Sequence, residues 1–434
     1  MSNPIHSTSA KSVLPMLAMR GLATGLCAGC VVGLLRLSHD RAAARVALWL
    51  EEWREVWWTV PIWFGVLVAL AVILRRIVRE EPLISGSGIP QTELALAGRL
   101  SFTWWRVLLA KFLGSWLALF GGLALGREGP SIQMGGAVGA GFHALWRPAA
   151  PHALTGSPYV VAGAVAGLAA AFGAPAAGVL FAFEEMKSRR DTSLIVAACA
   201  SAIGAHLMIR IVFGMGRILP FAGFEAPPLS SFWIVALEGA VFGVLGVGYN
   251  KTLLWLHDRE AGQTLIPDRW RALPPLLFAG CLALFAPLLI GGGESLIIFV
   301  GEHDVALKTL ILLLAFKYLF AQYSTVASIP GGLLMPILCL GALWGRLWAE
   351  LPVSALAAHG LASGSVQPYV LFGMVSYFAA TVRAPLTGIV LVTEMSGTYT
   401  CLPGSLLAGL IACKVANLLH CPPVYDSLKE RIRL

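Results

Sequence analysis

The sequence predicts an all-α polytopic membrane protein built from two structural repeats. Of its 434 residues, 57% are hydrophobic and only 12% are charged, whereas a soluble domain carries about 25% charged residues. Apolar segments of about 20 residues, the length of a helix that crosses a bilayer, follow one another along the chain. A motif from the first half also recurs in the second half. Together these observations predict one transmembrane domain over residues 1–434.

Nine apolar segments are long enough to span a bilayer as single helices. They are residues 12–36, 58–78, 158–183, 192–214, 230–256, 272–292, 305–328, 366–392 and 401–420. Glycine and proline interrupt three other apolar stretches, at 83–122, 131–147 and 333–350. Such breaks persist at membrane depth only where protein or a water-filled cavity covers them, so we expect short, tilted or re-entrant helices there. Residues 37–57 have mixed charge and predict an interfacial loop or helix.

Basic residues indicate how the chain lies in the membrane. The clusters at 187–190 and 429–433 follow apolar segments, and such clusters are typical of the cytoplasmic side. We therefore expect short cytoplasmic tails with both termini in the cytoplasm, a retained first helix, and no regulatory domain after Leu434. The net charge of +8 is scattered between apolar segments and forms no stripe, which argues against nucleic-acid binding.

The internal repeat is centred on an A-P-x-x-G-x5-E motif. Its two copies lie at 174–184 and 384–394, an offset of 210 residues. Residues 158–184 match residues 368–394 at 11 of 27 positions, and these matches include proline, tyrosine and glutamate, which apolar segments do not share readily by chance. Repeats with interrupted helices are typical of secondary transporters. The two repeats are predicted to cover residues of about 20–215 and 230–425.

The same helix-start pattern occurs three times, at 86–90, 126–130 and 331–336. Each stretch has a glycine break, then a proline, then an apolar helix. A helix N-terminus offers unpaired N–H groups and about half a positive charge, which attracts an anion by about 2 kcal/mol at 4 Å and an effective dielectric near 20. The alternative is that all three are ordinary helix starts beside small-residue packing. Three such breaks in one chain, one of them with a glutamate, favour a weak anion site.

Glu128 is the glutamate in the second of these breaks. An ionisable residue at membrane depth is costly and is therefore a functional candidate. Ionised, its carboxylate would compete with an anion for the same N–H groups, and protonated it could move aside. Its charge would then couple anion passage to proton binding. Alternatively, the neighbouring Arg127 simply neutralises it.

Other charged residues offer weaker candidates. Glu184 and Glu185 end the first copy of the repeated motif, where a carboxylate at a helix C-terminus needs compensation. Glu93 and Lys111 could form a buried ion pair. Residues 302–304 resemble a metal cluster but fit a solvated loop better, so no metal site is predicted. The chain has no nucleotide-binding, dinucleotide-binding or metalloprotease motif, which argues against an ATP-driven pump, a cofactor and an enzyme.

With these residues assembled, the chain resembles the CLC family of chloride channels and proton/chloride antiporters. The resemblance covers nearly the whole membrane domain. It is carried by GSGIP at 86–90, GREGP at 126–130, a GxxxP element at 332–336 and Tyr425. It implies an inverted-repeat helical fold and a homodimer with a separate anion pore in each subunit. It also implies the bacterial inner membrane as the location of this prokaryotic-type chain.

The resemblance also assigns residues to roles. The hydroxyls of Ser87 and Tyr425 would contact the central anion, Glu128 would be the external gate and proton acceptor, and Glu185 would transfer protons on the internal side. The chloride-binding set would be Ser87, Gly88, Ile89, Arg127, Glu128, Gly129, Leu334, Met335 and Tyr425.

Chloride/proton antiport is the leading functional interpretation. An uncoupled chloride channel is the alternative within the family, and a non-transporting structural membrane protein is the alternative outside it. Ser87 resembles chloride-preferring members, because nitrate-preferring ones tend to have proline there. Two positions depart from the family pattern: Leu334 replaces a usual phenylalanine, which changes the pore lining, and Gln91 stands where glutamate is frequent.

Overall fold

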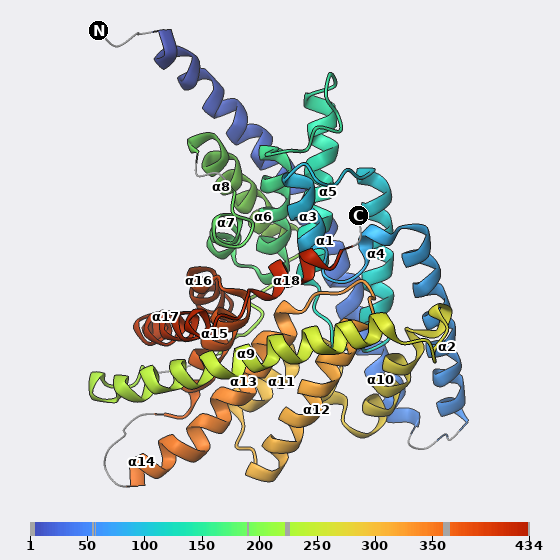
Figure 1. Cartoon of the computed structure of the whole chain (residues 1–434), viewed down its shortest axis with the longest axis vertical. Coiled ribbons are helices and arrows are strands. Elements are labelled where there is room, and N and C mark those ends of the chain that lie inside the picture. The colour runs from blue at the N-terminus through green and yellow to red at the C-terminus, as the bar shows by residue number, and fades with distance from the viewer. Residues whose placement is uncertain are drawn as a thin grey trace.

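The computed structural model describes residues 5–53, 56, 58–188, 191–221, 226–358 and 365–432 (Figure 1). Within these ranges every regular element is a helix. Seven of the described helices are long and apolar enough to cross a membrane, so the chain is an integral membrane protein. Arg189, Arg190 and Arg433, which belong to the basic clusters of the sequence analysis, lie outside the described residues.

The first half of the chain, blue to green in Figure 1, contains α1 to α8. Their bounds are α1 (Ile5–Trp53), α2 (Thr59–Glu80), α3 (Ile89–Leu96), α4 (Trp104–Phe120), α5 (Glu128–Trp146), α6 (Pro158–Phe172), α7 (Pro175–Glu184) and α8 (Thr192–Leu207). The stretch 83–122 is broken into short helices, as predicted. Residues 37–53 belong to α1, so the helical alternative for that segment is the right one.

The second half, yellow-green to red, contains the remaining helices. They are α9 (Phe232–Gly262), α10 (Leu273–Phe285), α11 (Glu294–Glu302), α12 (Leu307–Val326), α13 (Leu334–Trp348), α14 (Ser354–Ala358), α15 (Gln367–Val382), α16 (Pro385–Ser396), α17 (Leu402–Leu418) and α18 (Val424–Glu430). Helix α18, which the sequence did not predict, lies against α3 near the middle of the molecule (Figure 1).

Two predicted single spans were wrong in the same way. Residues 158–183 form α6 and α7, and residues 366–392 form α15 and α16. Both breaks fall before a proline, whose ring disfavours the helical conformation of the preceding residue. Ala174 and Ala384 accordingly leave the helical region, at φ −120° and −116°. The motif that identified the repeat therefore also marks a turn in each half.

The two halves pack their helices alike. In the first half α5 packs on α6, α6 on α8 and α8 on α1, and in the second half α13 packs on α15, α15 on α17 and α17 on α9. Small residues allow close approach: a side chain on Gly135 would overlap the backbone of Gly163, and one on Gly341 would overlap that of Gly373. The core of both halves is a set of such helix contacts.

The halves join at Gly126 and Gly332, which each stand four residues before the proline of their motif. The N–H of Gly126 donates to the oxygen of Gly332 at 2.7 Å, and the N–H of Gly332 donates back at 2.6 Å. This reciprocal antiparallel pair joins equivalent residues. A local two-fold relation between the repeats therefore passes through this pair.

Glu184 and Glu394, the last residues of the repeated motif, cap each other's helices. The Glu184 carboxylate accepts hydrogen bonds from the N–H of Leu386 (3.1 Å) and from the N–H and hydroxyl of Thr387 (2.6 and 2.8 Å), at the start of α16. Glu394 accepts from the N–H of Ala176 and Ala177 (3.2 and 2.9 Å), at the start of α7. These bonds supply the compensation that a carboxylate near a helix C-terminus requires.

We expect Glu394→Ala to destabilise the fold by about 1–3 kcal/mol, because two N–H groups of α7 lose a charged acceptor. Thermal unfolding of the detergent-solubilised protein measures the change. Glu302→Ala, at an exposed position, is the control. If Glu394→Ala unfolds at the same temperature as the control, the cap that Glu394 provides for α7 does not stabilise the fold.

Candidate functional site

Three helix starts converge where the sequence predicts them to. Gly88 precedes α3 in the left-handed region at φ 91°, and the N–H of Gly331 donates to the oxygen of Gly86 at 3.0 Å. A side chain on Gly129 would overlap Ser87, and one on Gly332 would lie 2.9 Å from the Gly129 nitrogen. The beginnings of α3, α5 and α13 are therefore in contact, and glycine is needed for that approach.

Two hydroxyls lie beside these helix starts. Ser87 precedes α3, and Tyr425 is in the first turn of α18. Both side chains are buried and their hydroxyls interact, yet neither oxygen has a partner at normal hydrogen-bond geometry among the described residues. Buried hydroxyls are usually hydrogen-bonded, and an unsatisfied one calls for an explanation. A ligand that accepts hydrogen bonds from both would supply it.

Glu128 is buried at the start of α5, as predicted. Its carboxylate lies within hydrogen-bonding reach of its own backbone N–H and of the N–H of Met335. A side chain on Gly126 would overlap Oε2 of Glu128, so the carboxylate folds back over the Gly126–Gly332 pair. The acid thus lies at the helix starts themselves and uses an N–H group that an anion would need.

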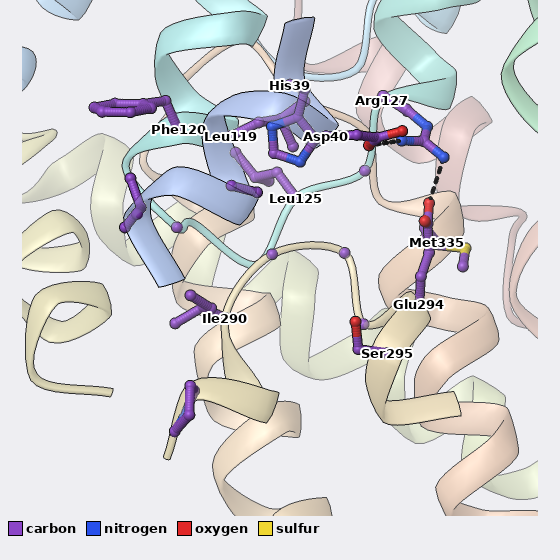
Figure 2. Close-up of a pocket in the computed structure, with 18 of the residues that line it drawn as sticks. His39, Asp40, Leu119, Phe120, Leu125, Arg127, Ile290, Glu294, Ser295 and Met335 are labelled. Carbon is purple, nitrogen blue, oxygen red and sulfur yellow. Dashed lines mark hydrogen bonds and ion pairs between the residues drawn. The ribbon is translucent and has the colours of Figure 1, made fainter. Parts of the chain in front are cut away.

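The Arg127 side chain contacts two carboxylates. Its guanidinium forms ion pairs with Asp40 at 3.2 Å and with Glu294 at 2.8 Å (Figure 2). The Arg127 guanidinium is also within electrostatic range of Glu128, so it contributes to neutralising that carboxylate, as the alternative in the sequence analysis has it. Any contact of Arg127 with an anion would come from its backbone.

A cavity of about 580 Å³ opens on the Glu128 side, and we call it the gate vestibule. Its lining includes Glu128. Met335, His39, Asp40, Arg127 and Glu294 also line it (Figure 2). The three carboxylates outnumber the one arginine in this lining. The acidic side chains come from α1, α5 and α11, so both halves of the chain contribute.

A second cavity of about 560 Å³ opens beside Ser87 and the end of α18, and we call it the α18 vestibule. Its lining includes Ser87 and Gly86, and four arginines against one aspartate: Arg75, Arg79, Arg271, Arg431 and Asp268. Gly126, Glu128 and Met335 thus line an acidic cavity, whereas Gly86 and Ser87 line a basic one. Gln91, one departure from the family pattern, also lines the α18 vestibule, and its amide donates to the oxygen of Ser85 at 2.9 Å.

The predicted Glu93–Lys111 ion pair is wrong. The ammonium of Lys111 donates to the oxygens of Ile84 and Gly86 at 2.8 and 2.7 Å, whereas Glu93 pairs with Lys429. Lys317 holds the oxygens of Leu289 and Gly291 in the same way, at 2.9 and 2.7 Å. Each lysine offsets the partial negative charge of carbonyl oxygens beside a glycine break. The partial positive charge of the N–H groups then determines the electrostatic potential at the helix start.

Glu185 follows α7 and is buried, whereas its neighbour Glu184 is engaged at α16. The Glu185 carboxylate is within electrostatic range of Tyr425 and of the charged groups Glu93, Asp426, Lys187 and Lys429. It therefore lies near the charged groups around α18. Leu334 and Met335, at the start of α13, are completely buried.

The sequence analysis missed Asp40 and Glu294, the partners of Arg127. Only their contact in space connects them, since Asp40 lies 87 residues before Arg127 and Glu294 belongs to the second half. The glycine run before Glu294 was a usable signal, because Gly293 precedes α11 at φ 103° as Gly88 precedes α3. Among the described residues, no three His, Cys, Asp or Glu side chains are grouped as a metal ion requires.

Comparison with known proteins places these features in one family. The family described as "Voltage gated chloride channel" matches residues 64–417. The H(+)/Cl(-) exchange transporter ClcA of Vibrio campbellii is 35% identical over 93% of this chain and 87% of its own length. That of Vibrio cholerae is 34% identical over 94% and 88%. A crystal structure of a slow cyanobacterial Cl-/H+ antiporter superposes with a TM-score of 0.86 and 28% identity, covering 95% of this chain and 97% of that one.

We expect Gly129→Ala to weaken chloride binding about tenfold, because the added methyl group forces the start of α5 away from Ser87. Isothermal titration calorimetry of the purified protein measures the affinity. Gly248→Ala, where a Cβ meets nothing within 4 Å, is the control. If Gly129→Ala folds normally and binds chloride as the control does, the contact of α3 with α5 does not shape the site.

Proposed function

Because this chain belongs to the voltage gated chloride channel family, we propose that it is a secondary active antiporter that exchanges chloride for protons. The single observation that carries the proposal is the convergence of three helix starts and two buried hydroxyls on a buried glutamate. The family is one of transporters, so the chain is not proposed to be an enzyme.

The proposed anion site uses partial charges instead of a cation. The hydroxyls of Ser87 and Tyr425 and the amides of Gly88, Ile89, Gly129, Leu334 and Met335 would donate to chloride, with the backbone of Arg127 and the displaced carboxylate of Glu128 beside it. Each helix start contributes about 2 kcal/mol at 4 Å and an effective dielectric near 20. This attraction is enough to offset part of the dehydration of chloride, while binding stays weak enough for release.

Glu128 would act as the gate and the proton acceptor. Its carboxylate reaches the N–H of Met335, so an ionised Glu128 and a chloride ion compete for that donor. Protonation removes the negative charge and with it the advantage of the carboxylate at the helix start. The gate then opens toward the vestibule that Glu128 lines. Each opening therefore requires a proton, which is the origin of coupling.

Glu185 would transfer protons on the opposite side. It is buried within electrostatic range of Tyr425 and of the charged groups around α18. Protons and chloride would thus both pass the Glu128 position. From there they would follow separate routes, protons by Glu185 and chloride by the α18 vestibule. Chloride would use the α18 vestibule, where four arginines face one aspartate and attract anions.

Antiport is favoured over the uncoupled channel because both proton-carrying positions, Glu128 and Glu185, are acidic and buried. The relatives at 34–35% identity are named exchange transporters, which supports the same choice. A non-transporting structural protein would have no reason to bring three helix starts, two hydroxyls and an acid together at one buried point.

The proposal includes an assembly and a location. We propose a single transmembrane domain with repeats at about 20–215 and 230–425, a homodimer with one pathway in each subunit, and residence in a bacterial inner membrane. We also propose that both termini lie in the cytoplasm. The α18 vestibule, with its arginines, would then open on the cytoplasmic face, where basic residues are enriched.

Liposomes that contain the purified protein test the antiport directly. We expect an imposed chloride gradient to drive protons uphill, because each gate opening carries a proton. Glu128→Gln and Glu185→Gln remove a titratable group and should abolish proton movement, whereas Glu302→Gln, an exposed control, should not. A pH electrode and a chloride electrode record both fluxes in one sample.

Two outcomes would contradict the proposal. Chloride flux without proton movement in the unmutated protein identifies a channel, and the absence of both fluxes in well-folded protein identifies a protein that does not transport either ion. Proton movement that survives Glu185→Gln would leave antiport in place but remove Glu185 from the route.

We expect Ser87→Pro to raise nitrate transport relative to chloride, because it removes a hydroxyl donor that interacts with Tyr425 at the site. The ratio of nitrate to chloride efflux from the same liposomes measures the effect. Ser427→Ala, which changes a buried hydroxyl bonded to the oxygen of Pro423, is the matched control. An unchanged ratio in Ser87→Pro would show that Ser87 is not an anion ligand.

A further inference from the structure

Helix α18 carries Tyr425 but has only seven residues. A helix of two turns is not stable in isolation, so contacts with other elements must hold it. Three ion pairs do so: Lys429 with Glu93 of α3, Asp426 with Lys187 after α7 at 2.7 Å, and Arg431 with Asp258 of α9 at 2.8 Å. The last helix is thus joined by charge to three separate elements.

Only one of these pairs is largely buried. The side chains of Glu93 and Lys429 are 6% and 23% exposed, whereas those of Lys187 and Asp258 are 63% and 59% exposed. Exposed pairs are screened by water and contribute little. Loss of one partner of a buried pair is much more disruptive, because the remaining charge is left uncompensated. The Glu93–Lys429 pair is therefore the main electrostatic link between α3 and α18.

The position of this pair relates it to the anion site. Glu93 is in the first turns of α3, which begins directly after Ser87 and Gly88, and Lys429 is four residues after Tyr425 on the same face of α18. The pair therefore joins the two helices about one turn behind the two unpaired hydroxyls. A change in the distance between α3 and α18 would change the separation of Ser87 and Tyr425.

Neighbouring charges keep the Lys429 end of this link ionised. Asp426 accepts from Lys429 at 2.9 Å and from Lys187 at 2.7 Å. Burial alone would raise the pKa of Asp426, but the hydrogen bonds from Lys187 and Lys429 outweigh it and hold that pKa below its ordinary value. Burial alone would lower the pKa of Lys429, but Glu93 and Asp426 outweigh it and raise that pKa. Both groups thus stay charged near neutral pH.

We propose that Glu93 and Lys429 are positioning residues that hold the Tyr425 hydroxyl against that of Ser87 and so set how strictly anion passage is coupled to protons. This inference rests on the proposed antiport. With the two hydroxyls together, chloride meets a barrier between its site and the α18 vestibule, which Ser87 lines. With α18 released, chloride can cross that barrier while Glu128 is displaced, and ions then pass without a proton.

The test compares the number of chloride ions moved per proton in liposomes. Lys429→Gln leaves the buried Glu93 carboxylate without its partner, and Glu93→Gln removes the bond from Lys429 to α3, so both should raise this ratio by about twofold or more. Lys429→Arg keeps the charge and should retain the ratio. Glu430→Gln, an exposed position on the same helix, is the control. A purely structural role would lower both fluxes together and leave the ratio unchanged.

A second variant guards against misfolding. The exchange Glu93→Lys with Lys429→Glu restores a pair of opposite charges, so it should return the ratio toward that of the unmutated protein. A folded Lys429→Gln with an unchanged ratio, or a Glu430→Gln with the same rise, overturns the proposal.

Chloride affinity separates this inference from the antiport on which it rests. If the unmutated protein binds chloride but moves no protons, antiport is wrong, and calorimetry then decides on the positioning role. Chloride affinity reduced about threefold or more in Lys429→Gln, but not in Lys429→Arg, supports that role, because Tyr425 no longer faces the anion. Equal affinity in all variants rejects it.

Discussion

The reciprocal hydrogen bonds between Gly126 and Gly332 are the constraint on which the rest of the structure depends. They fix the start of α5 against the start of α13, one from each half, and the bond from Gly331 to Gly86 adds the loop before α3. A Cβ at Gly126 would overlap the Glu128 carboxylate where it now lies, so a side chain there would displace that carboxylate. Backbone contacts thus determine where the three helix ends point, independently of side-chain rotamers.

The electrostatics of this junction follow from how its charges are paired. The guanidinium of Arg127 is held by Asp40 and Glu294, and the ammonium of Lys111 by two carbonyl oxygens. No full cation among these faces the point where the helices meet, so attraction comes from N–H dipoles and hydroxyls. Dipoles bind an anion weakly, and a carboxylate can replace it there. The same arrangement therefore explains both a permeant ion and an acidic gate.

Much of the site could be predicted because its signals are local. The glycine and proline of each break are adjacent in sequence, and the A-P-x-x-G-x5-E motif identifies the halves. The missed features depend on tertiary structure. The residues on both sides of Ala174 and of Ala384 are apolar, so hydropathy does not detect the turn at either position. Each pair of helices was therefore predicted as a single span. The partners of Arg127 and Lys429 come from distant segments, and no spacing rule connects them.

The exchanged caps of Glu184 and Glu394 have a consequence for the independence of the halves. Either half alone would contain a carboxylate without its amides and a helix start without its acceptor. Two copies of an ancestral half could satisfy each other in the same way, as the present halves do. Duplication and fusion of such a half-length gene would keep every one of these bonds. Moving the present halves out of contact would break all of them together.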